Sequence, residues 1–130
     1  MLSLVIPVYR NEASLPELLG ALEGLHQAFS GQLEVVFVVD GGPDRCHELL
    51  RERLPATGLT ATLVLLTRNF GAFSAVRMGL AEGRGDSFAV MAADLQEPPE
   101  LVLRMQDVLA RDEADVVVAE RALRHDPWLQ

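Results

Sequence analysis

The sequence predicts an α/β protein, a three-layer sandwich in which helices cover both faces of a mostly parallel sheet. Short apolar runs alternate along the chain with segments of helical periodicity. These runs are apolar almost throughout, so both faces of the sheet are expected to be covered. With 130 residues and 49% hydrophobic content, the chain can form a single domain with a packed core.

Five apolar runs rich in β-branched residues are the predicted strands. The first reads LSLVIPV and the second LEVVFVV, and both are too short for a typical buried helix. Glycine, proline or charged residues follow the first four of them, as expected where a strand gives way to a loop. The five runs comprise residues 2–8, 33–39, 61–67, 87–93 and 115–120.

Four helices are predicted after the first four strands. Ser14-Leu15-Pro16-Glu17 has the spacing of a capping box, and leucines at helical spacing follow until Gly31. In the third helix we expect Phe73, Val76 and Leu80 to face inward. The other helices are bounded by prolines and glycines. They are expected over residues 44–54, 71–82 and from 98 onward.

The charge of the chain excludes several classes of protein. The net charge is −8 and all 11 basic residues are arginines, so a basic nucleic-acid-binding face is not expected. The lack of lysine also excludes the phosphate-binding loop of nucleotide hydrolases, and it disfavours a receiver domain. An anionic ligand must therefore be bound by arginines, by backbone amides at helix starts or by a cation.

The sequence predicts a cytoplasmic protein. No apolar run has the length of a membrane-spanning helix, and the first ten residues do not have the pattern of a signal peptide. The single cysteine, Cys46, excludes an internal disulfide and is typical of a reducing compartment. Peripheral binding at the cytoplasmic face of the membrane is left open.

Polar residues follow each of the first four strands. The four segments read PVYRNE, DGGPD, TRNFG and ADLQEPP. Because ligands of open parallel sheets bind beyond the carboxyl ends of the strands, we expect one site at this edge of the sheet.

Two of these segments carry candidate ligand-binding residues that each have a simpler explanation. Asp40 can accept hydrogen bonds from a base or a ribose, and Gly41 permits close approach of a backbone. By itself, Asp40 is more often a turn aspartate before glycine. Arg68 and Asn69 can hold a diphosphate through directional donors, although Arg68 alone is more often a solvated loop residue.

The segment after the fourth strand carries a candidate metal site. Asp94 and Gln96 offer two oxygen ligands to a hard divalent cation, with phosphate and water oxygens completing its shell. A helix-capping role for Asp94 is equally favoured from the sequence alone.

Other reactive residue types have no partner in the sequence. The three histidines lie on different elements without ligand spacing, and they are interpreted as surface or packing residues. Cys46 has no recognisable base and is interpreted as structural. The histidines are His26, His47 and His125.

In this order and spacing, the segments VIPVYRNE, VVDGGPD, TRNFGAFSAVRMGL and AADLQEPPE resemble the family 2 glycosyltransferases of the GT-A fold. The similarity extends over nearly the whole chain and is strongest to the polyprenyl-phosphate sugar transferases, which include the dolichol-phosphate mannosyltransferases. The resemblance implies a Rossmann-like, nucleotide-binding half of a GT-A fold. It also implies a single domain over residues 1–130 that is truncated at its C-terminus.

The resemblance also assigns roles to the candidate residues. The first loop and the aspartate after the second strand bind the nucleotide in this family. Here those positions are Pro7, Val8, Tyr9, Asn11, Glu12 and Asp40. The family's acidic motif after the fourth strand binds Mg²⁺ or Mn²⁺, but its first acid is replaced by Ala92, which leaves Asp94 and Gln96.

The implied reaction is transfer of a sugar from a UDP- or GDP-linked donor to an acceptor such as a polyprenyl phosphate, with inversion at the anomeric carbon. Such a reaction belongs to the synthesis of lipid-linked sugars or cell-envelope glycans. Segments that supply the acceptor site and the catalytic base lie downstream in this family, so no base is named here. Glu120, Arg121 and Asp126 lie near the end of the chain, and the resemblance assigns them no role. The alternative to a glycosyltransferase is a nucleotide-binding module without turnover.

A third class, a dinucleotide-dependent oxidoreductase, is excluded because the segment PVYRNE stands where its glycine-rich loop would be.

The resemblance predicts that the chain self-associates. In the family, later strands complete the sheet beside the fourth strand, so the edge of a truncated sheet is open to pairing with a second copy. Light scattering at tens of micromolar protein is expected to give a mass above that of the monomer. A monomeric mass would contradict this prediction.

Overall fold

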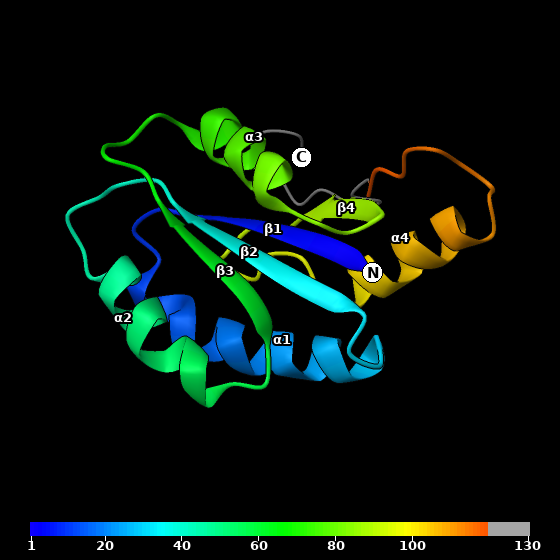
Figure 1. The fold of residues 1–130 in the computed structure, drawn as a ribbon, viewed down its shortest axis with the longest axis horizontal. Helices are drawn as coiled ribbons and strands as arrows, with labels where there is room; N and C mark the ends of the chain where they lie inside the picture. The colour runs from blue at the N-terminus through cyan, green and yellow to red at the C-terminus, as the bar shows by residue number, and fades with distance from the viewer. Residues whose placement is uncertain (120–130) are drawn as a thin grey trace, which may run out of the picture.

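The computed structural model describes residues 1–119 and contains a four-stranded parallel sheet (Figure 1). The strand order is β3-β2-β1-β4, so β1 lies between β2 and β4. Pairing along β1 and β2 is continuous, from Leu2 opposite Leu33 to Val8 opposite Val39. The strands are β1 (Leu2–Val8), β2 (Leu33–Val39), β3 (Thr60–Leu65) and β4 (Ser87–Val90).

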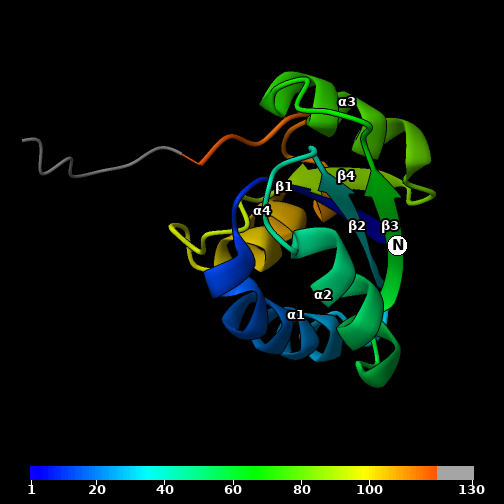
Figure 2. The same cartoon turned by 90° about the vertical axis from the view of Figure 1, so that its left-hand side faces the viewer.

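Helices cover both faces of the sheet, which confirms the predicted three-layer α/β fold. Figure 2 shows α3 on one face and the other helices on the opposite face. Across the described part of the chain, no helix combines the length and apolar character needed to cross a bilayer. The helices are α1 (Leu15–Ala28), α2 (Cys46–Arg53), α3 (Ala72–Glu82) and α4 (Glu100–Ala110), with 3-10 turns at Glu12–Ser14 and Leu54–Ala56.

Alternate residues of the central strands belong to two separate apolar clusters. The larger cluster joins β1 and β2 to the leucines of α1, to Leu50 of α2 and to Val102 of α4. The smaller one joins Val5, Val36 and Val38 to Ala75 of α3. Both faces of β1 and β2 are therefore buried, as their apolar sequences require.

The inward face of α3 differs from the prediction. Phe73 is 94% exposed and Leu80 is 42% exposed, whereas the buried residues of the helix are Ala75 and Gly79. Gly79 lies directly over Val5, because a Cβ at this position would come within 2.2 Å of Val5 Cγ1. Small residues let α3 approach the sheet closely, and this approach turns Phe73 toward solvent.

The predicted strand over residues 115–120 is wrong for residues 115–119, which form no strand, and residue 120 lies outside the described residues. β4 ends at Val90 instead of residue 93, although the amide of Met91 still donates to the carbonyl of Val5. Val116 and Val118 are 77% and 80% exposed. High strand propensity does not create a strand without a neighbour that buries one face.

The capping box at the start of α1 is also absent. The hydroxyl of Ser14 makes no cap hydrogen bond to the helix. It donates instead to the carbonyl oxygens of Asn11 and Ala93, at 3.0 and 3.3 Å. Ser14 therefore links the loop after β1 to the loop after β4.

We predict that Gly79→Ala lowers the free energy of unfolding by about 1–3 kcal/mol, because the added methyl group overpacks the contact with Val5. The control is Gly20→Ala in α1, where a Cβ would meet no atom within 4 Å. This control is expected to raise stability by about 0.5–1 kcal/mol through helix propensity. Urea denaturation measures both, and an equal effect of the two variants would contradict the close packing of α3.

Candidate functional site

A cavity lies at the carboxyl ends of the strands. The strand β1 lies in the middle of this edge, with β2 on one side and β4 on the other. The β1–β2 connection passes through α1 on one face, and the β3–β4 connection passes through α3 on the other. In open α/β sheets, such a reversal of strand order opens a crevice for ligands. The cavity has a volume of about 360 Å³ and is lined by Pro7, Tyr9, Asn11, Asp40, Asn69, Gly71, Ala72, Ala92, Ala93 and Asp94.

The structure brings together six of the eleven residues predicted for the site. They are Pro7, Tyr9, Asn11, Asp40, Asn69 and Asp94. Four loops therefore meet at one cavity, and Asp40 and Asp94 both face it. The five other candidates do not line this cavity. They are Val8, Glu12, Gly41, Arg68 and Gln96.

The cavity also includes four residues for which the sequence suggested no ligand-binding role. These are Gly71 and Ala72 at the start of α3, and Ala92 and Ala93 before Asp94. They have no polar side chain, so only their position next to Asn69 and Asp94 could have indicated their place in the site.

The carboxylate of Asp40 holds the loop that leads into α3. Its Oδ1 accepts from the amide of Phe70 at 2.8 Å, and its Oδ2 accepts from the amide of Gly71 at 3.0 Å. The side-chain amide of Asn69 donates to both Oδ2 and the carbonyl of Asp40, at 3.3 Å. Asp40 is only 3% exposed, so its negative charge is balanced within the protein. Asp40 thus fixes one wall of the cavity while it lines it.

Gly41 allows the loops after β2 and β3 to touch. Its φ angle is 64°, and a Cβ would lie 2.7 Å from the carbonyl carbon of Arg68. A side chain at this position would push Arg68 and Asn69 away from Asp40. Gly41 therefore acts on the site through backbone packing, which is the close approach that the sequence suggested for it.

Glu12 joins the loop after β1 to the start of α2. Its amide donates to Asp44 Oδ2 at 3.3 Å, and its Oε2 accepts from the amide of Arg45 at 3.4 Å. The thiol of Cys46 donates to Asp44 Oδ2 at 3.2 Å. Burial and this hydrogen bond raise the pKa of Cys46 from 9.0 to about 11, so the thiol stays protonated at neutral pH. These contacts agree with a structural role for Cys46.

Asp94 lies at a tight turn in the loop after β4. Its Oδ1 accepts from the amide of Gln96 at 3.2 Å, and Leu95 between them has a left-handed φ angle of 59°. This turn exposes the carboxylate of Asp94. The side chain of Gln96 is also exposed, but it does not line the cavity.

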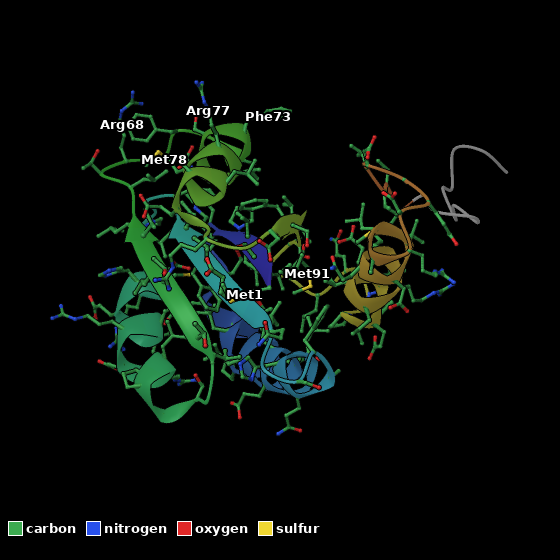
Figure 3. All side chains as sticks on the ribbon, turned by 45° about the vertical axis from the view of Figure 1, so that its right-hand side comes forward. Met1, Arg68, Phe73, Arg77, Met78 and Met91 are labelled. Atoms are coloured by element: carbon green, nitrogen blue, oxygen red, sulfur yellow. The ribbon has the colours of Figure 1, made fainter. Side chains whose placement is uncertain are left out.

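Arg68 is exposed and does not line the cavity. Its guanidinium carbon lies 4.1 Å from the centre of the Phe70 ring, in a cation–π contact. Figure 3 shows Arg68 on the loop before α3, with its side chain directed outward. To reach a diphosphate in the cavity, Arg68 would have to leave the ring of Phe70.

The donor set suits a cation that arrives with a diphosphate better than one held by the protein alone. Within residues 1–119, no three His, Cys, Asp or Glu side chains gather as metal ligands would. Asp94 provides an exposed carboxylate at the cavity, whereas Ala92 provides no ligand atom. Mg²⁺ commonly uses one or two protein carboxylates together with substrate phosphates and water.

Comparison with protein families matches residues 3–130 to "Glycosyl transferase family 2". The chain belongs to this family. It is 40% identical over 126 residues to an undecaprenyl-phosphate 4-deoxy-4-formamido-L-arabinose transferase of Pseudomonas paraeruginosa, which covers 97% of this chain and 37% of the relative. The protein of the same name from Aeromonas hydrophila is 38% identical, over 100% of this chain and 40% of the relative. The chain thus spans about two fifths of the length of these family 2 relatives, which are polyprenyl-phosphate sugar transferases by name.

Solved structures show the same fold. S. aureus TarS superposes with a TM-score of 0.74 at 20% identity, over 95% of this chain and 23% of TarS. Its fragment 1–349, in complex with UDP-GlcNAc, gives a TM-score of 0.72 at 20% identity, over 88% of this chain and 32% of the fragment. The family 2 chain therefore has the GT-A fold that its sequence predicted.

We predict that Asp40→Asn lowers the free energy of unfolding by about 2–4 kcal/mol, because the new amide group faces a backbone N–H donor in a buried place. Hydrogen exchange at Phe70 and Gly71 is expected to become faster. The control is Asp86→Asn, which removes an exposed carboxylate paired with the N-terminus and should change stability little. Unchanged exchange at Phe70 and Gly71 in Asp40→Asn would show that Asp40 does not hold this loop.

Proposed function

We propose that this chain binds the nucleotide-diphosphate sugar in a glycosyltransferase that transfers the sugar to a polyprenyl phosphate. One observation carries the proposal: residues from the carboxyl ends of all four strands, including Asp40 and Asp94, line a single cavity. The 38–41% identical relatives are named as transferases that act with undecaprenyl phosphate. A lipid-linked phosphate is therefore the proposed acceptor.

The nucleoside would lie near the wall formed by Tyr9, Asn11 and Asn69. Tyr9 is 38% exposed at the cavity, so its ring can contact a base or ribose. The amide of Tyr9 donates to Asn11 Oδ1 at 2.8 Å, which fixes the Asn11 side chain at the end of β1. The TarS fragment was solved with UDP and with UDP-GlcNAc, which favours a UDP-linked donor as the first to test, with GDP as the alternative.

The diphosphate would lie near the start of α3 and Asp94. The first amides of a helix carry partial positive charge, and Gly71 and Ala72 line the cavity there. Asp94 would bind Mg²⁺ or Mn²⁺ that accompanies the diphosphate. When bound, such a cation neutralises charge on the departing diphosphate.

The proposed reaction is a single displacement that inverts the anomeric carbon. An oxygen of the acceptor phosphate forms the new bond to this carbon as the bond to the nucleoside diphosphate breaks. The acceptor phosphate is already ionised at neutral pH, so this attack needs no general base. The chain's residues then have to bind and orient the donor and shield its diphosphate from competing water.

The alternative is a nucleotide-binding module without turnover. The position of Ala92 favours it, because this residue lines the cavity next to Ala93 and Asp94 but has no oxygen to bind a cation. Incubation with UDP-sugars and undecaprenyl phosphate separates the two proposals. Formation of a lipid-linked sugar supports the enzyme, and donor binding without product supports the module.

We predict that UDP raises the melting temperature of the chain and that Mn²⁺ increases this shift. Asp94→Ala should abolish the part that depends on Mn²⁺ while it preserves the shift by UDP alone. The matched control is Glu97→Gln, which removes an exposed acid three residues away that does not line the cavity. An unchanged Mn²⁺ effect in Asp94→Ala would remove Asp94 from the site.

A further inference from the structure

The outer surface of α3 exposes aromatic and basic side chains together. Phe73 is 94% exposed and Phe70 is 45% exposed, although both are large apolar residues. Arg77 follows Phe73 by four residues and therefore shares its side of the helix. Figure 3 shows Phe73 and Arg77 on the side of α3 away from the sheet, and Arg68 on the loop that leads into the helix. Arg68 and Phe70 belong to the loop just before α3, which begins at Ala72. We call Arg68, Phe70, Phe73 and Arg77 together the α3 outer face.

The charge of this face is opposite to that of the whole chain. The chain has a net charge of −8, yet residues 54–81 contain Arg68 and Arg77 and no acidic residue. The nearest acid along α3 is Glu82, at the C-terminal end of the helix. The α3 outer face is thus a cationic and aromatic region on an acidic protein.

These residues have the chemistry of a membrane-interface contact. Exposed aromatic side chains insert between lipid headgroups, and neighbouring arginines attract anionic lipids. Single exposed apolar residues are common on protein surfaces, so the exposure of Phe73 alone would not indicate a membrane contact. The combination matters, because Arg68 stacks on Phe70 and both arginines lie in a segment free of acids.

The α3 outer face is also close to the donor cavity. Phe73 is the second residue of α3, and Gly71 and Ala72 just before it line the cavity. A bilayer in contact with Phe73 would therefore lie close to the residues that line the cavity, within reach of a lipid-linked phosphate.

We propose that the α3 outer face docks on an anionic lipid bilayer. The proposal rests on the proposed function, because docking on a bilayer would bring the chain to an acceptor that is held in the membrane. Docking itself requires neither donor nor acceptor, so it can be tested without them.

The test is sedimentation of the chain with vesicles of equal parts phosphatidylglycerol and phosphatidylcholine, and with vesicles of phosphatidylcholine alone. Binding is expected only to the anionic vesicles and should weaken as salt is added.

Arg77→Gln should weaken this binding roughly fivefold, because one arginine at an anionic surface contributes about that factor. Phe73→Ser should weaken it by at least about fivefold, since the ring supplies the apolar contact. The controls are Arg51→Gln, an exposed arginine on α2, and Val118→Ser, an exposed apolar residue outside α3.

A local signal tests the orientation of the face. In a chain with Phe73→Trp and with its single tryptophan replaced by Trp128→Phe, vesicles should shift the tryptophan emission to shorter wavelength. No binding to anionic vesicles would overturn the proposal, as would equal losses in Arg51→Gln and Arg77→Gln. A lipid-free dimer that Phe73→Ser dissociates would also overturn it, because a second copy would then occupy this face. The UDP-induced shift in melting temperature, measured without vesicles, reports separately on the proposed function.

Discussion

The carboxylate of Asp40 is the interaction on which the arrangement of the site depends. Asp40 directly follows the central strand β2, and its carboxylate accepts from the amides of Phe70 and Gly71, which ties the loop after β3 to the sheet. This charge is buried and receives several hydrogen bonds, which makes loss of its partners costly. The position of the first turn of α3, and with it one wall of the cavity, follows from this contact. Gly41 makes it possible by letting the backbone of Arg68 pass within contact distance.

The sheet and its functional edge could be predicted from the sequence because they depend on local patterns. β1 and β2 are apolar throughout, and their observed bounds match the predicted ones. Polar residues at successive strand ends had to meet because parallel strands all end at the same edge. The place of Asp40 and Asp94 at one cavity follows from this rule and did not require knowledge of their contacts.

The errors arose where a residue's neighbours decide its position. Phe73 has the spacing of an inward residue, yet the contact of Gly79 with Val5 selects another side of α3 for the sheet. Residues 115–119 have the composition of a strand, but they form none. The role of Arg68 at a diphosphate stays a prediction, and its contact with the ring of Phe70 could not be inferred from its charge. Propensity and periodicity contain no information about these partners.

The hydroxyl of Ser14 connects two loops that line the cavity. It lies within hydrogen-bond distance of the carbonyls of both Asn11 and Ala93, so the segment after β1 and the acidic turn after β4 share one hydrogen-bond donor. A ligand that reorders either segment changes the free energy of the other, and this linkage is reciprocal by thermodynamic necessity. Ser14 therefore gives these two segments of the cavity lining a common hydrogen-bond partner, and a change at one of them is felt at the other.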